Sequence, residues 1–140
     1  MLLFVACLLA LVGCGGSKYD LAKVTGTVTI DGMPYTGKVL FYPARKGEAI
    51  VAGRPSYGLP DADGRFTLNC VKPGDGAMVG EHTVTLFVAK DHAEAYPALR
   101  ALEFNRVPYP LGKVTVSADE PNDIELAFTS EQIRRYGTMR

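Results

Sequence analysis

The chain of 140 residues contains no tryptophan, only 2 histidines and 3 cysteines, and carries no net charge, with 15 Lys and Arg against 15 Asp and Glu. A neutral chain lacks the basic stripe that meets nucleic-acid phosphates, so we expect no nucleic-acid partner. So few histidines and cysteines provide little for a zinc site or a disulfide framework, and we expect no metal or other cofactor. The 15 Gly and 9 Pro favour many short strands joined by turns over a helical bundle.

The longest apolar run stands at the start of the chain, at residues 2–12. It is too short to cross a membrane, which takes about 20 residues, and is typical of the hydrophobic part of a signal peptide. No Lys or Arg precedes the run, so we expect the translation start to lie upstream. The sequence that ends it, Leu11-Val12-Gly13-Cys14, resembles the lipobox of bacterial lipoproteins.

This resemblance implies that residues 1–13 are a lipoprotein signal peptide and that the sulfur of Cys14 carries diacylglycerol. It usually implies a third acyl chain on the new amine, and two or three chains anchor a protein stably. Residues 14–22 are then a lipidated tether, and the membrane is a partner through the anchor. Gly15 favours the outer membrane or cell surface of the bacterial envelope over the inner membrane. The alternative is an ordinary secretory signal in which Cys14 is incidental.

The three cysteines of the chain have different expected fates. Cys7 leaves with the signal peptide, and acylation takes Cys14, so Cys70 has no partner for an intramolecular disulfide. We expect Cys70 to pack as a small buried hydrophobic residue.

From Val24 to Ile30 the pattern has a period of two, with threonines at every second position, which predicts a half-buried strand. Asp31-Gly32 then has turn chemistry. Further strands are expected at 37–42, 65–70, 80–88, 113–117 and 123–128, long loops at 44–60 and 89–112, and a polar tail at 130–140 with one amphipathic turn around Ile133. The pattern predicts an all-β fold, a single antiparallel β-sandwich of about seven strands over residues 23–129.

Several short motifs stand in a recognisable order: VTGTV at 24–28, DG at 31–32, GKVLF at 37–41, DADGRF at 61–66 and KPGDGA at 72–77, followed by GEHTV at 80–84. Together they resemble the carboxypeptidase regulatory-like domain over about residues 22–128. The resemblance implies a transthyretin-like (prealbumin-like) sandwich that serves as a spacer or binding module. The family pattern has no catalytic residues to carry over, so we expect no enzymatic activity.

The sequence Asp61-x-Asp63-Gly64 looks like half of a calcium loop. A calcium loop needs further oxygen ligands and flanking helices, so we favour a turn whose Asp side chains accept nearby backbone N–H groups. Of the two histidines, His82 falls on the inward side of a strand, where we expect it hydrogen-bonded and half-buried. His92 stands in a charged loop without the spacing of a zinc site.

Enzyme chemistry has little support in the sequence. The hydroxyisourate hydrolases share the transthyretin-like sandwich, but this chain has no histidine in its first strand, and its ending RRYGT at 134–138 only resembles their C-terminal motif in scrambled form. Without that histidine the hydrolysis has no proton acceptor. No serine stands in a Gly-x-Ser-x-Gly elbow.

The loops contain aromatic and basic residues that could bind a ligand: Tyr57, Tyr96, Tyr109, Arg54 and Arg106. Exposed aromatics stack on sugars or contact partner proteins, but they can equally cover the open end of a sandwich. We therefore expect a non-catalytic, lipid-anchored cell-envelope protein, a structural or protein-interaction module. The alternative is an extracellular glycan- or peptide-binding module that uses loops 44–60 and 89–112, with an envelope protein or glycan as its partner.

Overall fold

The computed structural model describes residues 19–45, 47, 52–87, 111–119 and 121–138. This part of the chain is built mostly from strands, which confirms the all-β prediction. The elements, in chain order, are β1 (Leu21–Ala22), β2 (Val24–Ile30), β3 (Met33–Pro34), β4 (Val39–Pro43), β5 (Ser56–Gly58), β6 (Arg65–Asn69), β7 (Ala77–Met78), β8 (Gly80–Leu86), β9 (Gly112–Val116), β10 (Asn122–Phe128) and α3 (Ser130–Thr138).

The larger sheet has the strand order β10-β2-β6-β5-β4-β8-β9, with β3 paired to β2, and β1 pairs separately with β7. The expected antiparallel arrangement holds for every ladder except one, because β10 runs parallel to β2 over their whole length. Two parallel neighbouring strands need a long connection between them. Here the chain that connects β2 to β10 contains all the other strands of the larger sheet. An alternating pattern does not encode a partner's direction, so the sequence could not show this exception.

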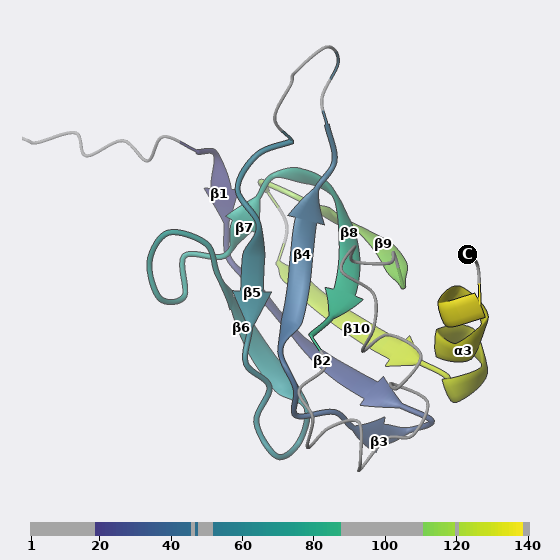
Figure 1. Cartoon of the computed structure of the whole chain (residues 1–140). Helices are drawn as coiled ribbons and strands as arrows, with labels where there is room; N and C mark the ends of the chain where they lie inside the picture. The colour runs from purple at the N-terminus through teal and green to yellow at the C-terminus, as the bar shows by residue number, and fades with distance from the viewer. Residues whose placement is uncertain (1–18, 46, 48–51, 88–110, 120, 139–140) are drawn as a thin grey trace, which may run out of the picture.

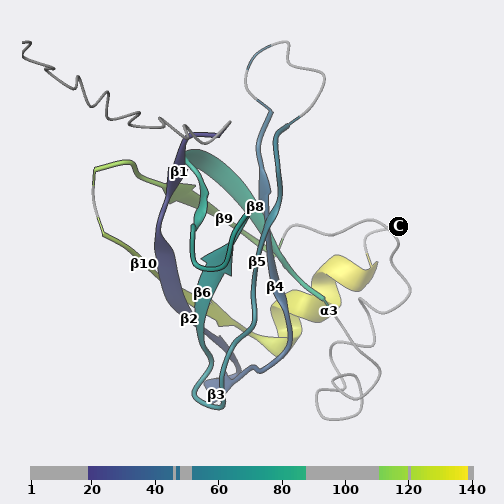
Figure 2. The ribbon, with the colours of Figure 1, turned by 90° about the vertical axis from the view of Figure 1, so that its left-hand side faces the viewer.

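The sheet curls, so that β2 and β10 pass diagonally behind the upright strands β4, β5 and β8 (Figure 1). The two halves enclose one core of buried side chains, including Val24, Val28, Phe41, Leu68 and Val84. A quarter-turn view shows α3 beside the lower part of this curl (Figure 2). The apolar positions of the alternating strands therefore meet in one interior, which is the main source of stability for such a fold.

The strand predicted at 24–30 is confirmed as β2, with Val24, Val28 and Ile30 buried. The turn after it is confirmed as well, since Asp31 and Gly32 have φ of 51° and 79°. Both values lie in the left-handed region, as a tight hairpin turn requires. The strands predicted at 37–42, 65–70, 80–88, 113–117 and 123–128 correspond to β4, β6, β8, β9 and β10.

One expectation about irregular chain is wrong, and another holds only in part. The segment 44–60 was expected as a loop, but it contains β5, which joins β4 to β6 and completes the sheet. Its three residues carry no alternating apolar pattern, so nothing in this segment indicates a strand. In the polar tail expected at 130–140, the amphipathic turn predicted around Ile133 is confirmed but extends into the longer helix α3, with Ile133 fully buried in the core.

Helix α3 is held at its start and on its inner side. The Thr129 hydroxyl accepts the backbone N–H of Gln132 at 3.1 Å, which is an N-cap hydrogen bond. The side-chain amide of Gln132 donates to the carbonyl of Leu111 at 2.8 Å. These contacts tie the helix to the segment before β9. Among the described residues, no helix has the length and apolar character needed to cross a membrane.

Candidate functional site

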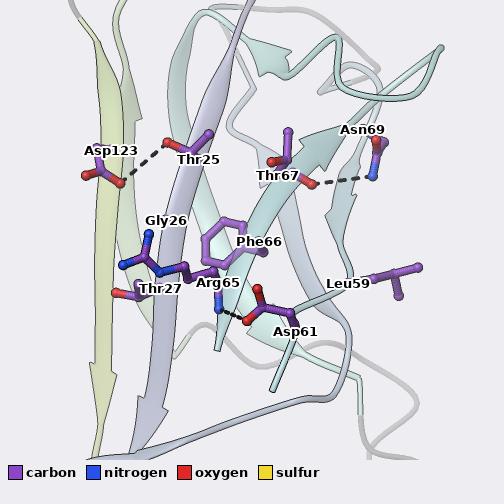
Figure 3. A pocket seen from close by; sticks show the side chains of 10 residues that line it. All are labelled: Thr25, Gly26, Thr27, Leu59, Asp61, Arg65, Phe66, Thr67, Asn69 and Asp123. Atoms are coloured by element: carbon purple, nitrogen blue, oxygen red, sulfur yellow. Dashed lines mark hydrogen bonds between the residues drawn. The ribbon is translucent and has the colours of Figure 1, made fainter. Parts of the chain in front are cut away.

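The outer face of β10, β2 and β6 is hollowed by an open groove of about 600 Å³ (Figure 3). Sites for small ligands usually fall between about 300 and 1,000 Å³, so this groove is large enough to hold one. Most of its lining is polar and comes from the three strands and the segment between β5 and β6: Thr25, Gly26, Thr27, Leu59, Asp61, Arg65, Phe66, Thr67, Asn69 and Asp123.

Strand pairing places three of these polar side chains in one row across the sheet. Asp123 stands beside Thr25, and Thr25 stands beside Thr67. Neighbouring strands lie about 4.8 Å apart, so each residue in the row is a near neighbour of the next. The Thr25 hydroxyl donates to the Asp123 carboxylate at 3.4 Å, which orients both groups along the groove floor. The row therefore presents one carboxylate and two hydroxyl groups.

A second row lies about 7 Å further along the strands, where Glu125 pairs with Thr27 and Thr27 pairs with Arg65. The side chain of Arg65 extends from β6 across β2 (Figure 3). Within the described part of the chain, its guanidinium makes no ion pair, and Glu131–Arg135 is the one salt bridge found there. Arg65 thus brings free hydrogen-bond donors to the groove.

The end of the groove is shaped by a turn that the sequence predicted. One carboxylate oxygen of Asp61 accepts the backbone N–H groups of Asp63 at 2.9 Å and Arg65 at 3.0 Å. Gly64 has a φ of 76° and its N–H donates to the carbonyl of Asp61. These hydrogen bonds confirm the prediction that residues 61–64 form a turn, which we favoured over half of a calcium loop. The turn also fixes the point at which Arg65 enters the sheet.

Asn69 closes the other end of β6 and is occupied by structural hydrogen bonds. Its side-chain oxygen accepts the N–H of Gly74 at 2.6 Å, and its amide donates to the carbonyls of Tyr57 and Thr67. An Asn side chain offers two acceptor sites and two donors, so little of this capacity remains. The groups left to meet a ligand are the threonine hydroxyls, the Arg65 guanidinium, the Asp123 carboxylate and the second carboxylate oxygen of Asp61.

The floor of the groove depends on a glycine. A side chain at Gly26 would place its Cβ 2.2 Å from the carbonyl oxygen of Ile124 and 2.7 Å from the ring of Phe66. Phe66 pairs with Gly26 across the two strands, and its ring is buried. The ring fills the space that the missing side chain leaves, which lets β10, β2 and β6 pack closely behind the polar rows.

Two of the residues expected to bind a ligand lie in the described part. Tyr57 is not in a loop but on β5, and the residue is 40% exposed. The ammonium of Lys38 lies 5.4 Å from the centre of its ring and 5.6 Å from that of Phe87, in cation–π range. Arg54 donates from its Nε to the carbonyl of Cys70 at 3.1 Å. The Nε of Arg54 is therefore used in a structural hydrogen bond, whereas the ring of Tyr57 remains partly exposed to solvent.

The other expected site residues, Cys14, Tyr96, Arg106 and Tyr109, lie outside the described residues, as does His92. Of the five residues expected to bind a ligand, the structure therefore places only Arg54 and Tyr57. The groove residues were missed because each is an ordinary outward position on its strand. The alternation did mark Thr25, Thr27 and Thr67 as outward, but only the strand order shows that they face one groove.

The titratable groups of the core have structural roles. His82 is 1% exposed, rather than half-buried as expected, and its Nε2 bonds the carbonyl of Met78 at 2.6 Å. Cys70 is buried and its thiol lies 3.9 Å from the carbonyl of Arg54, which confirms its expected packing. In the described ranges, no group of three or more His, Cys, Asp and Glu residues is arranged to hold a metal ion.

Comparison of the chain with protein-family models, with curated proteins and with solved structures finds no significant match.

Proposed function

We propose that this protein is an exported, lipid-anchored module of the bacterial cell envelope that binds a partner and performs no chemistry on it. The observation that carries the proposal is the pattern at residues 2–14, a short apolar run that ends in Gly13 and Cys14. The first described strand, β1, begins at Leu21. Seven residues of extended chain reach about 25 Å, so acyl chains on Cys14 would hold the domain close to the membrane surface.

The proposed domain type is the carboxypeptidase regulatory-like domain with a transthyretin-like sandwich. The curled sheet and its single enclosed core support this assignment, because a sandwich is also two sheet layers around one core. The motifs at 31–32 and 61–64 also form tight turns in the structure, with Gly32 and Gly64 at positive φ. Such domains act as spacers or binding modules, which agrees with a groove on an open sheet face.

A binding role, rather than catalysis, is supported by what the reactive side chains do. The imidazole of His82 is buried against Phe41, with ring centres 5.9 Å apart, and the thiol of Cys70 is buried as well. A general base or nucleophile has to reach a substrate. The groups that do face the groove are threonine hydroxyls, a guanidinium and carboxylates, which suit recognition by hydrogen bonds.

The test is expression of the full chain from its native start, followed by membrane fractionation and intact-mass measurement. We expect the wild type to partition with membranes and to carry the mass of the acyl groups, and Cys14→Ala to lose both. Cys7→Ala is the matched control, because the same substitution inside the signal leaves the acylated position intact. A soluble, unacylated wild-type chain, or unchanged partitioning of Cys14→Ala, contradicts the proposal.

A further inference from the structure

We propose that the groove on β10, β2 and β6 is a binding site for a neutral glycan, a chain of sugars that presents hydroxyl groups and no charge. This inference goes beyond the anchored module proposed above and stands whether or not Cys14 is acylated. It also moves the glycan site from the loops, where the sequence suggested it, to the sheet face.

The charges of the groove favour a neutral ligand. Its lining holds one cation, Arg65, and two carboxylates, Asp61 and Asp123. A phosphate or uronate would meet the two carboxylates, and a polyamine would meet the guanidinium, so either kind of ion faces a like charge within the groove. A ligand without charge avoids this cost and can use groups of both signs.

The hydrogen-bonding groups fit hydroxyl-bearing ligands in particular. A sugar hydroxyl both donates and accepts, and so do the hydroxyls of Thr25, Thr27 and Thr67. The Arg65 guanidinium only donates and the Asp123 carboxylate only accepts, so a sugar hydroxyl can satisfy either of them. The two rows repeat this mixture about 7 Å apart along the strands, which suits a ligand with many hydroxyl groups in sequence.

A peptide fits the same face less well. Peptides that add to a sheet pair with an unpaired edge, which here is the outer edge of β10. The groove instead lies on the face of the sheet, where β2 stands between β10 and β6, and β6 stands between β2 and β5. Their backbone groups are thus used within the sheet. Peptide grooves also rely on apolar anchor pockets, whereas Leu59 is the one exposed large apolar side chain in this lining.

The site is open and supplies few fixed contacts, so we expect weak binding, with a Kd on the order of 1 mM. The experiment uses the full chain in detergent micelles and follows backbone amide shifts by NMR. The probes are maltohexaose, cellohexaose and chitohexaose as neutral glycans, hexagalacturonate as a charged one, and a ten-residue Gly-Ser peptide. We expect at least one neutral hexasaccharide to shift amides of β2, β6 and β10.

Two variants test the groove itself. Arg65→Gln removes a free charged donor and should weaken binding about tenfold, and Thr67→Val removes one hydroxyl and should weaken it about fivefold. Thr115→Val is the matched control, because Thr115 is an exposed threonine on β9 at the far edge of the sheet. It should leave the affinity unchanged. Valine suits a strand, and the amide spectrum of each variant reports whether the fold is kept.

The proposal is overturned if none of the neutral hexasaccharides shifts the amides of these strands, or if only hexagalacturonate or the peptide does so. It is also overturned if Arg65→Gln and Thr67→Val bind as tightly as Thr115→Val. None of these outcomes bears on acylation of Cys14, which the fractionation experiment measures separately.

Discussion

Asp31 and Ser130 are 99 residues apart in sequence, and together they fasten the start of α3 to the turn between β2 and β3. One carboxylate oxygen of Asp31 accepts the backbone N–H of Ser130 at 2.9 Å, and the other accepts its hydroxyl. The contact also fits the helix dipole, since a carboxylate is favourable at a helix N-terminus. Asp31 itself has a φ of 51°, a conformation that Asp and Asn tolerate better than most residues.

The first prediction concerns how the Asp31–Ser130 contact responds to pH. The hydroxyl and backbone hydrogen bonds from Ser130 lower the pKa of Asp31 below its ordinary value of 3.8, with a smaller contribution from the positive charge of Arg134. A lowered pKa in the folded state stabilises the protein above pH 3.8, and this contribution is lost as the pH falls through the folded-state value. Asp31→Asn, which keeps the turn, should lower the melting temperature at neutral pH.

Melting temperature measured against pH checks this expectation. The difference between wild type and Asp31→Asn should be constant near neutrality and should shrink as the pH falls below 3.8. Ser130→Ala should show a smaller pH-dependent difference from wild type, because one of the two donors remains. A difference that stays the same down to acid pH would show that the carboxylate charge contributes nothing here.

The second prediction concerns Asp75, which organises the loop between β6 and β7. Its carboxylate accepts three backbone N–H groups, those of Cys70 at 2.7 Å, Val71 at 2.9 Å and Lys72 at 2.7 Å. Partial burial raises the pKa of Asp75, but these hydrogen bonds outweigh it and hold the pKa below 3.8. Asp75→Asn should destabilise the protein by about 1–3 kcal/mol, because an amide has one acceptor oxygen for three donors.

Urea unfolding at neutral pH measures this loss. Asp63→Asn is the control, because no hydrogen bond to the Asp63 side chain is found among the described residues, and its own N–H donates to Asp61. We expect the control to change the free energy of unfolding by less than about 0.5 kcal/mol. Equal effects of the two substitutions would mean that the three N–H groups find water as readily as they find Asp75.

The strands could be predicted because their signal is local. In β2 every second residue is apolar or glycine, and the buried positions follow that alternation residue by residue. The turns at 31–32 and 61–64 could be predicted as well, because Asp and Gly favour turn conformations through their own local chemistry. These parts of the fold need no knowledge of distant residues.

The rest of the fold and the groove depend on contacts between residues that are far apart in sequence. Thr25, Thr67 and Asp123 form one row only because β2 lies between β6 and β10, and that order is a property of the whole sheet. The sequence predicts only one turn of α3, because Ile133 is the one apolar residue from Ser130 to Arg135, too weak a signal for a helical period. The spacing of Thr129 and Gln132 was a readable sign, since it matches the helix capping box.

The third prediction separates a packed helix from a polar tail. Ile133 is fully buried in the core, so Ile133→Ala should destabilise the protein by about 2–4 kcal/mol. Arg135→Ala on the same helix is the control, because it removes an exposed side chain and its ion pair with Glu131 at 2.8 Å and leaves the core intact. Such exposed pairs contribute about 0.3–0.5 kcal/mol. Urea unfolding compares the two, and a small effect of Ile133→Ala would mean that α3 is not part of the core.

The fourth prediction concerns the close contact of β10, β2 and β6 beneath the groove. A methyl group at Gly26 would stand 2.2 Å from the backbone oxygen of Ile124, which cannot move without disturbing the parallel ladder. Overpacking a well-packed site typically costs about 1–3 kcal/mol, and a clash with backbone falls at the upper end. Gly26→Ala should therefore destabilise the protein strongly and weaken any ligand bound in the groove.

The matched control is Gly112→Ala on β9. The nearest atom to a new methyl group at Gly112 is in the ring of Phe128, at 3.8 Å, which is an ordinary van der Waals contact. Its φ is not in the left-handed region either, so alanine fits there without strain and restricts the unfolded chain. Gly112→Ala should be neutral or stabilising by up to about 1 kcal/mol. If thermal unfolding shows both variants equally stable, β10 does not pack against β2 as closely as the parallel register requires.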